Sequence, residues 1–135
     1  MGLDTNTEAL SFYAKAELLK FRQLYPEALQ VLDTLEIGFY GHSLQDEVLW
    51  MRAQISLKMG QPLEAKKHLS ALLAEHGDDI LADNALMALA ELMEQEGDNE
   101  AAQALYQQLL TEHPDSFFIA EARSRIRRLR GEQPM

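Results

Sequence analysis

The sequence predicts an all-α fold of three stacked helix pairs followed by a seventh helix. Apolar residues recur at spacings of three and four, as in half-buried helices, and no stretch alternates apolar and polar side chains as a strand does. The same pattern returns every 37 residues, which places Ala28, Ala65 and Ala102 in one register. Such a period is typical of stacked helix pairs, and the length fits a single domain over residues 1–135.

The first helix pair is predicted within residues 9–42. Its first helix opens with a capping box at Thr5 and should reach about Arg22. Pro26 suits the first turn of the second helix, because its fixed φ fits there and the missing N–H needs no partner.

The second pair is predicted within residues 46–79, with Ser43 as the cap of its first helix. Gly60 and Pro62 separate its two helices. The third pair, residues 83–116, should begin near Asp79.

Pro114 ends the third pair, and Ser116 is placed to cap a seventh helix over residues 117–130.

In the first helix of each pair one row should face the partner helix: Phe12, Ala16, Leu19; Leu49, Ala53, Ser56; Leu86, Ala90, Met93. In the seventh helix this row becomes Arg123, Arg127 and Arg130. Burying three unpaired guanidinium groups is costly, so we expect this helix to be a solvating cap.

The opposite row of the seventh helix is apolar and should pack back on the preceding helix: Ala122, Ile126, Leu129. The outward row of the first helix is mostly polar, with Leu18 as its apolar member: Ser11, Lys15, Leu18, Arg22. Both ends therefore look terminated, and we expect a self-contained unit of three repeats.

The charge distribution is uneven. The chain has 22 acidic and 12 basic residues, a formal net charge of −10. Residues 1–122 hold 21 acids and 7 bases, whereas residues 123–135 hold five arginines and one glutamate. An acidic body argues against nucleic acid as a partner.

Other classes of function are limited by what the sequence lacks. Without cysteine the chain has no disulfide, no thiol chemistry and no cysteine-based metal site. No apolar run approaches the roughly 18 residues of a membrane span, and no signal region opens the chain. The compartment, periplasm or cytoplasm, stays open, as does whether the chain is a full protein or an excised fragment.

These repeats resemble the tetratricopeptide repeat. The resemblance rests on three sets of repeated positions: Ala16, Ala53, Ala90; Ala28, Ala65, Ala102; Leu32, Leu69, Tyr106. It implies a right-handed superhelix whose first helices line a concave groove that binds peptides or protein segments. The long period and the His113–Ser116 stretch are similar to bacterial cell-envelope members of the family.

The predicted groove contains one row from each first helix. Tyr13, Trp50 and Met87 share one repeat position, which predicts a ladder of large apolar groups beside carboxylates. The alternative is that they pack only against neighbouring helices. The candidate groove residues are Leu10, Tyr13, Glu17, Lys20, Glu47, Trp50, Gln54, Leu57, Asn84, Met87, Glu91, Glu94 and Arg128, with Glu121 and Ser124 in the same row.

Other candidate sites are weaker. The arginine run could bind phosphate or nucleic acid, but a solvated cap helix explains it better. The histidines lack metal-ligand spacing and suit helix ends: His42, His68, His76, His113. Glu17, Glu91 and Glu94 have no nucleophile or phosphate loop beside them, so we predict no catalytic residue, metal or cofactor.

The sequence therefore favours a non-catalytic protein–protein interaction module, a scaffold or adaptor in a bacterial assembly. Its ligand should carry apolar anchors with basic flanks, and the chain should be a monomer or weak dimer. The alternative is a structural or homo-oligomerisation unit using Phe117 and Phe118, Phe39 and Tyr40, or Leu18. An enzyme is a distant third.

Overall fold

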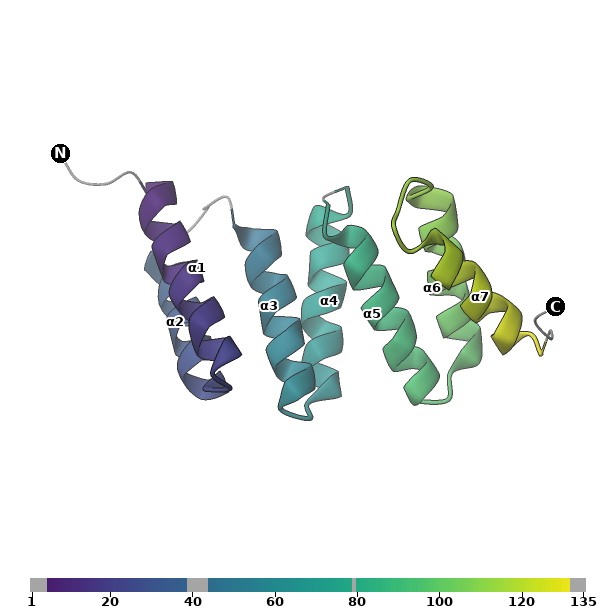
Figure 1. The fold of residues 1–135 in the computed structure, drawn as a ribbon, viewed down its shortest axis with the longest axis horizontal. Helices are drawn as coiled ribbons and strands as arrows, with labels where there is room; N and C mark the ends of the chain where they lie inside the picture. The colour runs from purple at the N-terminus through teal and green to yellow at the C-terminus, as the bar shows by residue number, and fades with distance from the viewer. Residues whose placement is uncertain (1–4, 39–43, 79, 132–135) are drawn as a thin grey trace. The chain divides into compact units, whose positions relative to one another are not determined.

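The computed structural model describes residues 5–38, 44–78 and 80–131, which form seven α-helices and no strand (Figure 1). The fold class is therefore the predicted one. The helices are α1 (Thr5–Phe21), α2 (Tyr25–Gly38), α3 (Gln45–Lys58), α4 (Pro62–His76), α5 (Ala82–Gln95), α6 (Asn99–Glu112) and α7 (Ile119–Leu129).

The chain divides into two compact units, residues 1–65 (unit 1) and residues 66–135 (unit 2), with the boundary inside α4. Each unit has its own apolar cluster. The predicted arrangement of all repeats as one domain stays a prediction.

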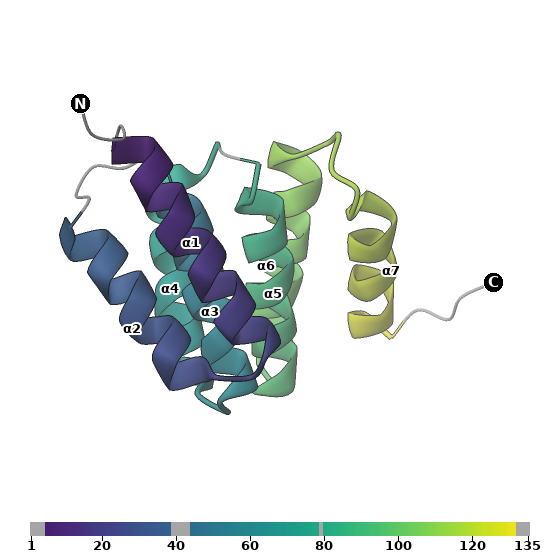
Figure 2. The ribbon, with the colours of Figure 1, turned by 60° about the vertical axis from the view of Figure 1, so that its left-hand side comes forward.

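In unit 1, α1 and α2 form an antiparallel pair joined by a short turn (Figure 2). The predicted partner row of α1 lies in this core, because Ala16 is fully buried and Phe12 and Leu19 pack against the cluster. The buried members of the cluster are Ala9, Ala16, Ala28, Leu32, Leu35, Val48, Met51 and Ile55.

The turn between the two helices of each pair has the same backbone conformation in all three pairs. Gln23, Gly60 and Gly97, spaced 37 residues apart, all have positive φ, of 63°, 71° and 83°. The residue after each of them donates its backbone N–H to the carbonyl five residues earlier, a bond that is typical of helices ending in a left-handed residue. The three bonds run from Leu24 to Leu19, from Gln61 to Ser56 and from Asp98 to Met93. Glycine adopts this conformation without steric cost, so Gln23 is the strained member.

One row of α3, which contains Val48, Arg52 and Ile55, packs toward the preceding helix pair. Val48 and Ile55 belong to the unit 1 core. Between them, Arg52 donates to Asp33 (2.7 Å) and Glu36 (3.0 Å), two carboxylates of α2. A charged residue fits in this row because α2 supplies both of its partners.

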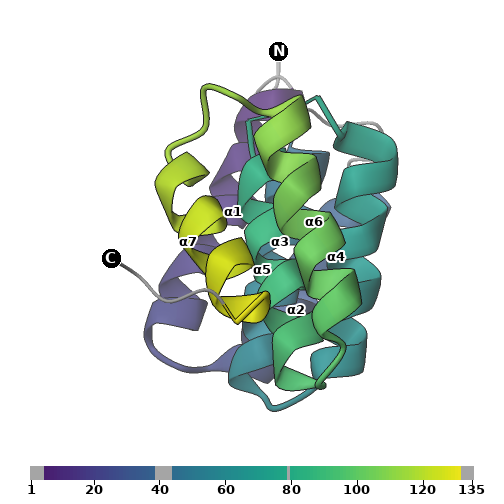
Figure 3. The same cartoon turned by 90° about the vertical axis from the view of Figure 1, so that its right-hand side faces the viewer.

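In unit 2, α5, α6 and α7 share a second core. Leu86 and Ala90 of α5 are buried in it and Met93 packs against it, as the partner row predicts. Tyr106 of α6 is the largest fully buried side chain. On α7, Ala122 and Ile126 are buried against this core and Leu129 packs beside them, so α7 covers α6 as predicted (Figure 3).

Two helix starts differ from the predictions. α5 begins at Ala82 rather than near Asp79. α7 begins at Ile119, and Ser116 does not cap it. The Ser116 hydroxyl instead donates to Asp83 (2.6 Å) and accepts the Phe118 N–H (3.0 Å), because a carboxylate at the start of α5 lies within its reach. Ser43 lies outside the described residues; at the start of α3, Leu44 makes no side-chain cap.

Candidate functional site

The predicted groove residues of unit 1 lie on two neighbouring helices. We call them the first-helix face: Leu10, Tyr13, Glu17 and Lys20 of α1 with Glu47, Trp50, Gln54 and Leu57 of α3. Within each helix they are three or four residues apart, so they share one side. The Lys20 ammonium donates to the Gln54 amide oxygen (3.0 Å), and this bond brings the two rows together.

The first-helix face presents apolar groups to solvent. Leu10 is 55% exposed and Leu57 is 40% exposed. Tyr13 and Trp50 are partly buried. Tyr13 also packs against the unit 1 core, which holds its ring in place.

The electrostatics of this face are negative. Burial raises the pKa of the Tyr13 hydroxyl to about 12, and the carboxylates of Glu17, Glu47 and Asp46 add to the rise. Three carboxylates that act on one hydroxyl also favour cations placed beside it. The face therefore combines apolar area with a preference for positive charge.

The predicted groove residues of unit 2 behave differently. Met87 is only 5% exposed and belongs to the unit 2 core, so the expectation of an apolar contact for a ligand is wrong there. The side chain packs inward with residues of α6 and α7. Asn84 and Glu91 are partly buried.

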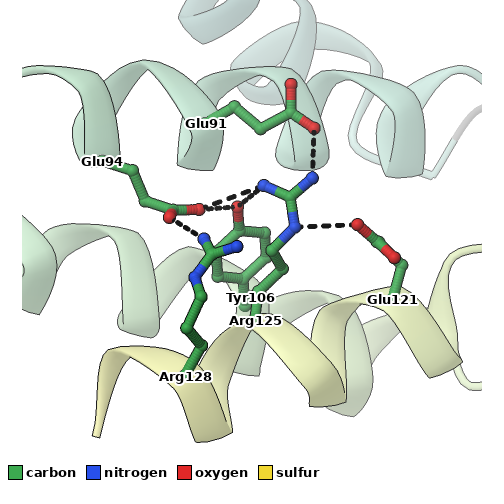
Figure 4. Close-up of polar contacts among 6 residues, drawn as sticks. All are labelled: Glu91, Glu94, Tyr106, Glu121, Arg125 and Arg128. Atoms are coloured by element: carbon green, nitrogen blue, oxygen red, sulfur yellow. Dashed lines mark hydrogen bonds and ion pairs between the residues drawn. The ribbon is translucent and has the colours of Figure 1, made fainter. Parts of the chain in front are cut away.

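Glu94 lies in a polar network that joins α5, α6 and α7 (Figure 4). Its carboxylate accepts hydrogen bonds from the Tyr106 hydroxyl and from Arg128, and the Arg125 guanidinium lies 3.3 Å away. Arg125 also contacts Glu121 (2.8 Å) and Glu91 (3.7 Å). Glu94 is thus already paired with two arginines of α7, and its contact with a ligand stays a prediction.

The pKa values in this network follow from the contacts. Burial alone would raise the pKa of the Glu94 carboxyl, but the Tyr106 hydrogen bond and the charges of Arg128 and Arg125 outweigh it, so that pKa lies below its usual value. Burial raises the pKa of the Tyr106 hydroxyl, and the neighbouring carboxylate raises it further. Glu94 is therefore ionised at neutral pH and Tyr106 is a donor.

Replacing Glu94 by Gln should destabilise unit 2 by about 2 kcal/mol at pH 7, because hydrogen bonds to a charged group are worth about 1.5–3 kcal/mol. A carboxyl with a lowered folded-state pKa stabilises the fold fully above its unfolded pKa, about 4.3, and loses this contribution as the pH falls through the folded value. In thermal melts from pH 7 to pH 3, the difference in stability between the two proteins should shrink once the pH falls below about 4.3. A constant difference across this range would contradict the assignment.

Arg125 and Tyr106 are the functional side chains that sequence reasoning missed in this network. Arg125 stood only among five arginines, and Tyr106 only as the large residue of a repeat position. The available signal was the spacing of four from Glu121 to Arg125, which suits an ion pair along a helix.

The other residues that the sequence raised as possible metal or phosphate ligands lie in both units. Within residues 5–38, 44–78 and 80–131, no three histidine or acidic side chains gather as metal ligands. Arg123, Arg127 and Arg130 are exposed, as a cap helix requires. In the same ranges no helix has the length and apolar character of a membrane span.

The surfaces of the self-association alternative are apolar where they are described. Leu18 is 49% exposed, and Phe117 is 92% exposed with its ring edge-on to Phe118, 5.6 Å between centroids. Phe39 and Tyr40 lie outside the described residues.

Comparison with known proteins gives one finding. A family model described as tetratricopeptide repeat matches residues 56–126, just over half of the chain. The matched segment runs from the end of α3 into α7. Among curated proteins no sequence matches the chain.

Proposed function

Because the chain belongs to the tetratricopeptide repeat family, whose repeats generally mediate protein–protein interaction, we propose that its first-helix face holds a segment of a partner protein. The chain then acts as a scaffold or adaptor and not as a catalyst, which is the typical role of the family. The partner is a peptide or protein segment with apolar anchors.

The observation that carries this proposal is the junction of α1 and α3 in unit 1. The Lys20–Gln54 hydrogen bond sets the two rows side by side, with Leu10 and Leu57 exposed on them. Tyr13, a partly buried ring that packs against the unit 1 core, is a favourable anchor, because little side-chain entropy remains to be lost on binding.

The chemistry of the face defines the ligand. Apolar anchors should provide most of the affinity, since exposed ion pairs contribute only about 0–1 kcal/mol each. Lysine or arginine beside the anchors would be steered by Glu17, Glu47 and Asp46, the carboxylates that act on Tyr13. The association rate should therefore fall with added salt while the dissociation rate changes little.

Random-sequence peptides displayed on phage provide an unbiased test. Selection on the immobilised protein should enrich apolar residues flanked by lysine or arginine. Titration of the selected peptides should show that Trp50→Ala weakens binding by about 2 kcal/mol, the size of an interface hot spot.

Ile37→Ala is the matched control, because Ile37 is an exposed apolar residue of α2 outside the first-helix face. It should leave the affinity unchanged, and circular dichroism should show that both variants keep the helical fold. Equal losses in the two variants, or selection of acidic peptides, would refute the proposed site.

A further inference from the structure

Four of the five arginines in the C-terminal segment fall into two sets on α7. Arg125 and Arg128 reach the carboxylates of α5 and α7 in the network of Figure 4. Arg123 and Arg127 are exposed, and within the described part of the chain they make no hydrogen bond or ion pair. Ion pairing within the fold accounts for Arg125 and Arg128. The exposure of Arg123 and Arg127 suits a cap helix, and it also presents both guanidinium groups to a ligand.

The second set lines a shallow cleft of about 220 Å³ between α6 and α7. Its lining residues are Gln107 and Leu110 of α6, Arg123, Ile126 and Arg127 of α7, and Arg130 directly after α7. Leu110 and Ile126 provide apolar surface between the guanidinium groups. The cleft is therefore cationic with an apolar floor, the opposite charge preference to that of the first-helix face.

The repeat register shows what kind of element fits this cleft. Arg123, Arg127 and Arg130 lie 37 residues after Leu86, Ala90 and Met93. In α5 those three residues pack against the following helix, α6. The side of α7 that would receive a helix is thus the side that carries the arginines.

We propose that this cleft docks an acidic amphipathic helix of a partner protein. Three Glu or Asp side chains, spaced i, i+4 and i+7, would face Arg123, Arg127 and Arg130, and an apolar residue between them would contact Leu110. The site adds a second interaction surface and does not depend on the first-helix face.

Charge favours this occupant over two others. A second copy of the chain has the same formal net charge of −10, so two copies repel one another at long range. Nucleic acid would meet three cleft arginines but also the acidic excess of residues 1–122. A short acidic helix would be attracted by the three arginines at the cleft. Because it is small, it would be repelled only weakly by the acidic residues elsewhere in the chain.

Two synthetic peptides test the proposal on the full chain. The patterned peptide is an alanine-based helix with glutamates at i, i+4 and i+7 and one leucine between them. The spread peptide has the same composition with the glutamates distributed around the helix. Fluorescence anisotropy measures the affinity of each for the protein at low salt.

The cleft variant combines Arg123→Glu and Arg127→Glu. Its control, Lys58→Glu with Lys67→Glu, makes the same change of net charge at exposed lysines outside the cleft. We expect the cleft variant to weaken binding of the patterned peptide at least tenfold and the control variant to change it less than twofold. The spread peptide should bind at least tenfold more weakly than the patterned one.

Four results would overturn the proposal. The patterned peptide fails to bind; the two peptides bind equally; the two variants lose affinity equally; or a short DNA duplex binds more tightly than the patterned peptide and loses binding in the cleft variant. Sedimentation adds a fifth, because a dimer of the wild-type chain that disperses in the cleft variant would assign the cleft to a second copy.

Discussion

Truncation after Ser116, which removes α7, is expected to destabilise unit 2 by several kcal/mol or cause it to aggregate. Ala122 and Ile126 are buried against the core that contains Tyr106 and Leu109. Uncovering this core returns apolar surface to water at about 25 cal/mol per Å². The loss is comparable with a domain's total stability of about 5–15 kcal/mol.

Thermal unfolding followed by circular dichroism, with sedimentation to detect aggregates, measures this effect. Truncation after Gly131 is the control, because it keeps α7 and removes only residues 132–135. A chain truncated after Ser116 that melts within a few degrees of the control would show that α7 does not cap the core.

Tyr106→Ala is expected to cost about 3–5 kcal/mol, the usual loss for truncating a large buried aromatic ring to alanine. Tyr106 is fully buried, and its hydroxyl donates to the Glu94 carboxylate. The substitution therefore opens a cavity in the unit 2 core and removes one donor from a charged group. Urea unfolding measures the change.

Tyr106→Phe separates the two contributions. It keeps the ring in the core and removes only the hydroxyl, so we expect a smaller loss of about 1–2 kcal/mol. In combination with Glu94→Gln the effects should not be additive, because Tyr106→Phe removes the donor of this hydrogen bond and Glu94→Gln removes the charge of its acceptor. Additive losses would show that the Glu94–Tyr106 bond contributes nothing.

The fold was predictable because one pattern recurs. A period of 37 residues placed Ala28, Ala65 and Ala102 in one register, and all three are fully buried. The cap role of α7 followed from the cost of burying arginine. Gln23 shows the limit of such reasoning, since only the structure reveals that it shares the left-handed turn of Gly60 and Gly97.

The site was less predictable, because repeat register gives the side of a helix but not how deep it is buried. Trp50 and Met87 share a register position, yet Met87 is almost fully buried in the core of α5, α6 and α7. Sequence also does not show which acid an arginine reaches. Glu94 was therefore expected to meet a ligand, whereas it meets Arg125, Arg128 and Tyr106.

Fluorescence quenching of Trp50 by acrylamide in the free protein tests the central claim most directly. Trp50 is the only tryptophan, so its emission reports on the first-helix face alone. If this face binds a partner, the neutral quencher should reach Trp50 partly, with a constant between those of free and fully buried indole, and a selected peptide should reduce it. A Trp50 that is already sealed from acrylamide in the free protein would contradict a binding role for this face.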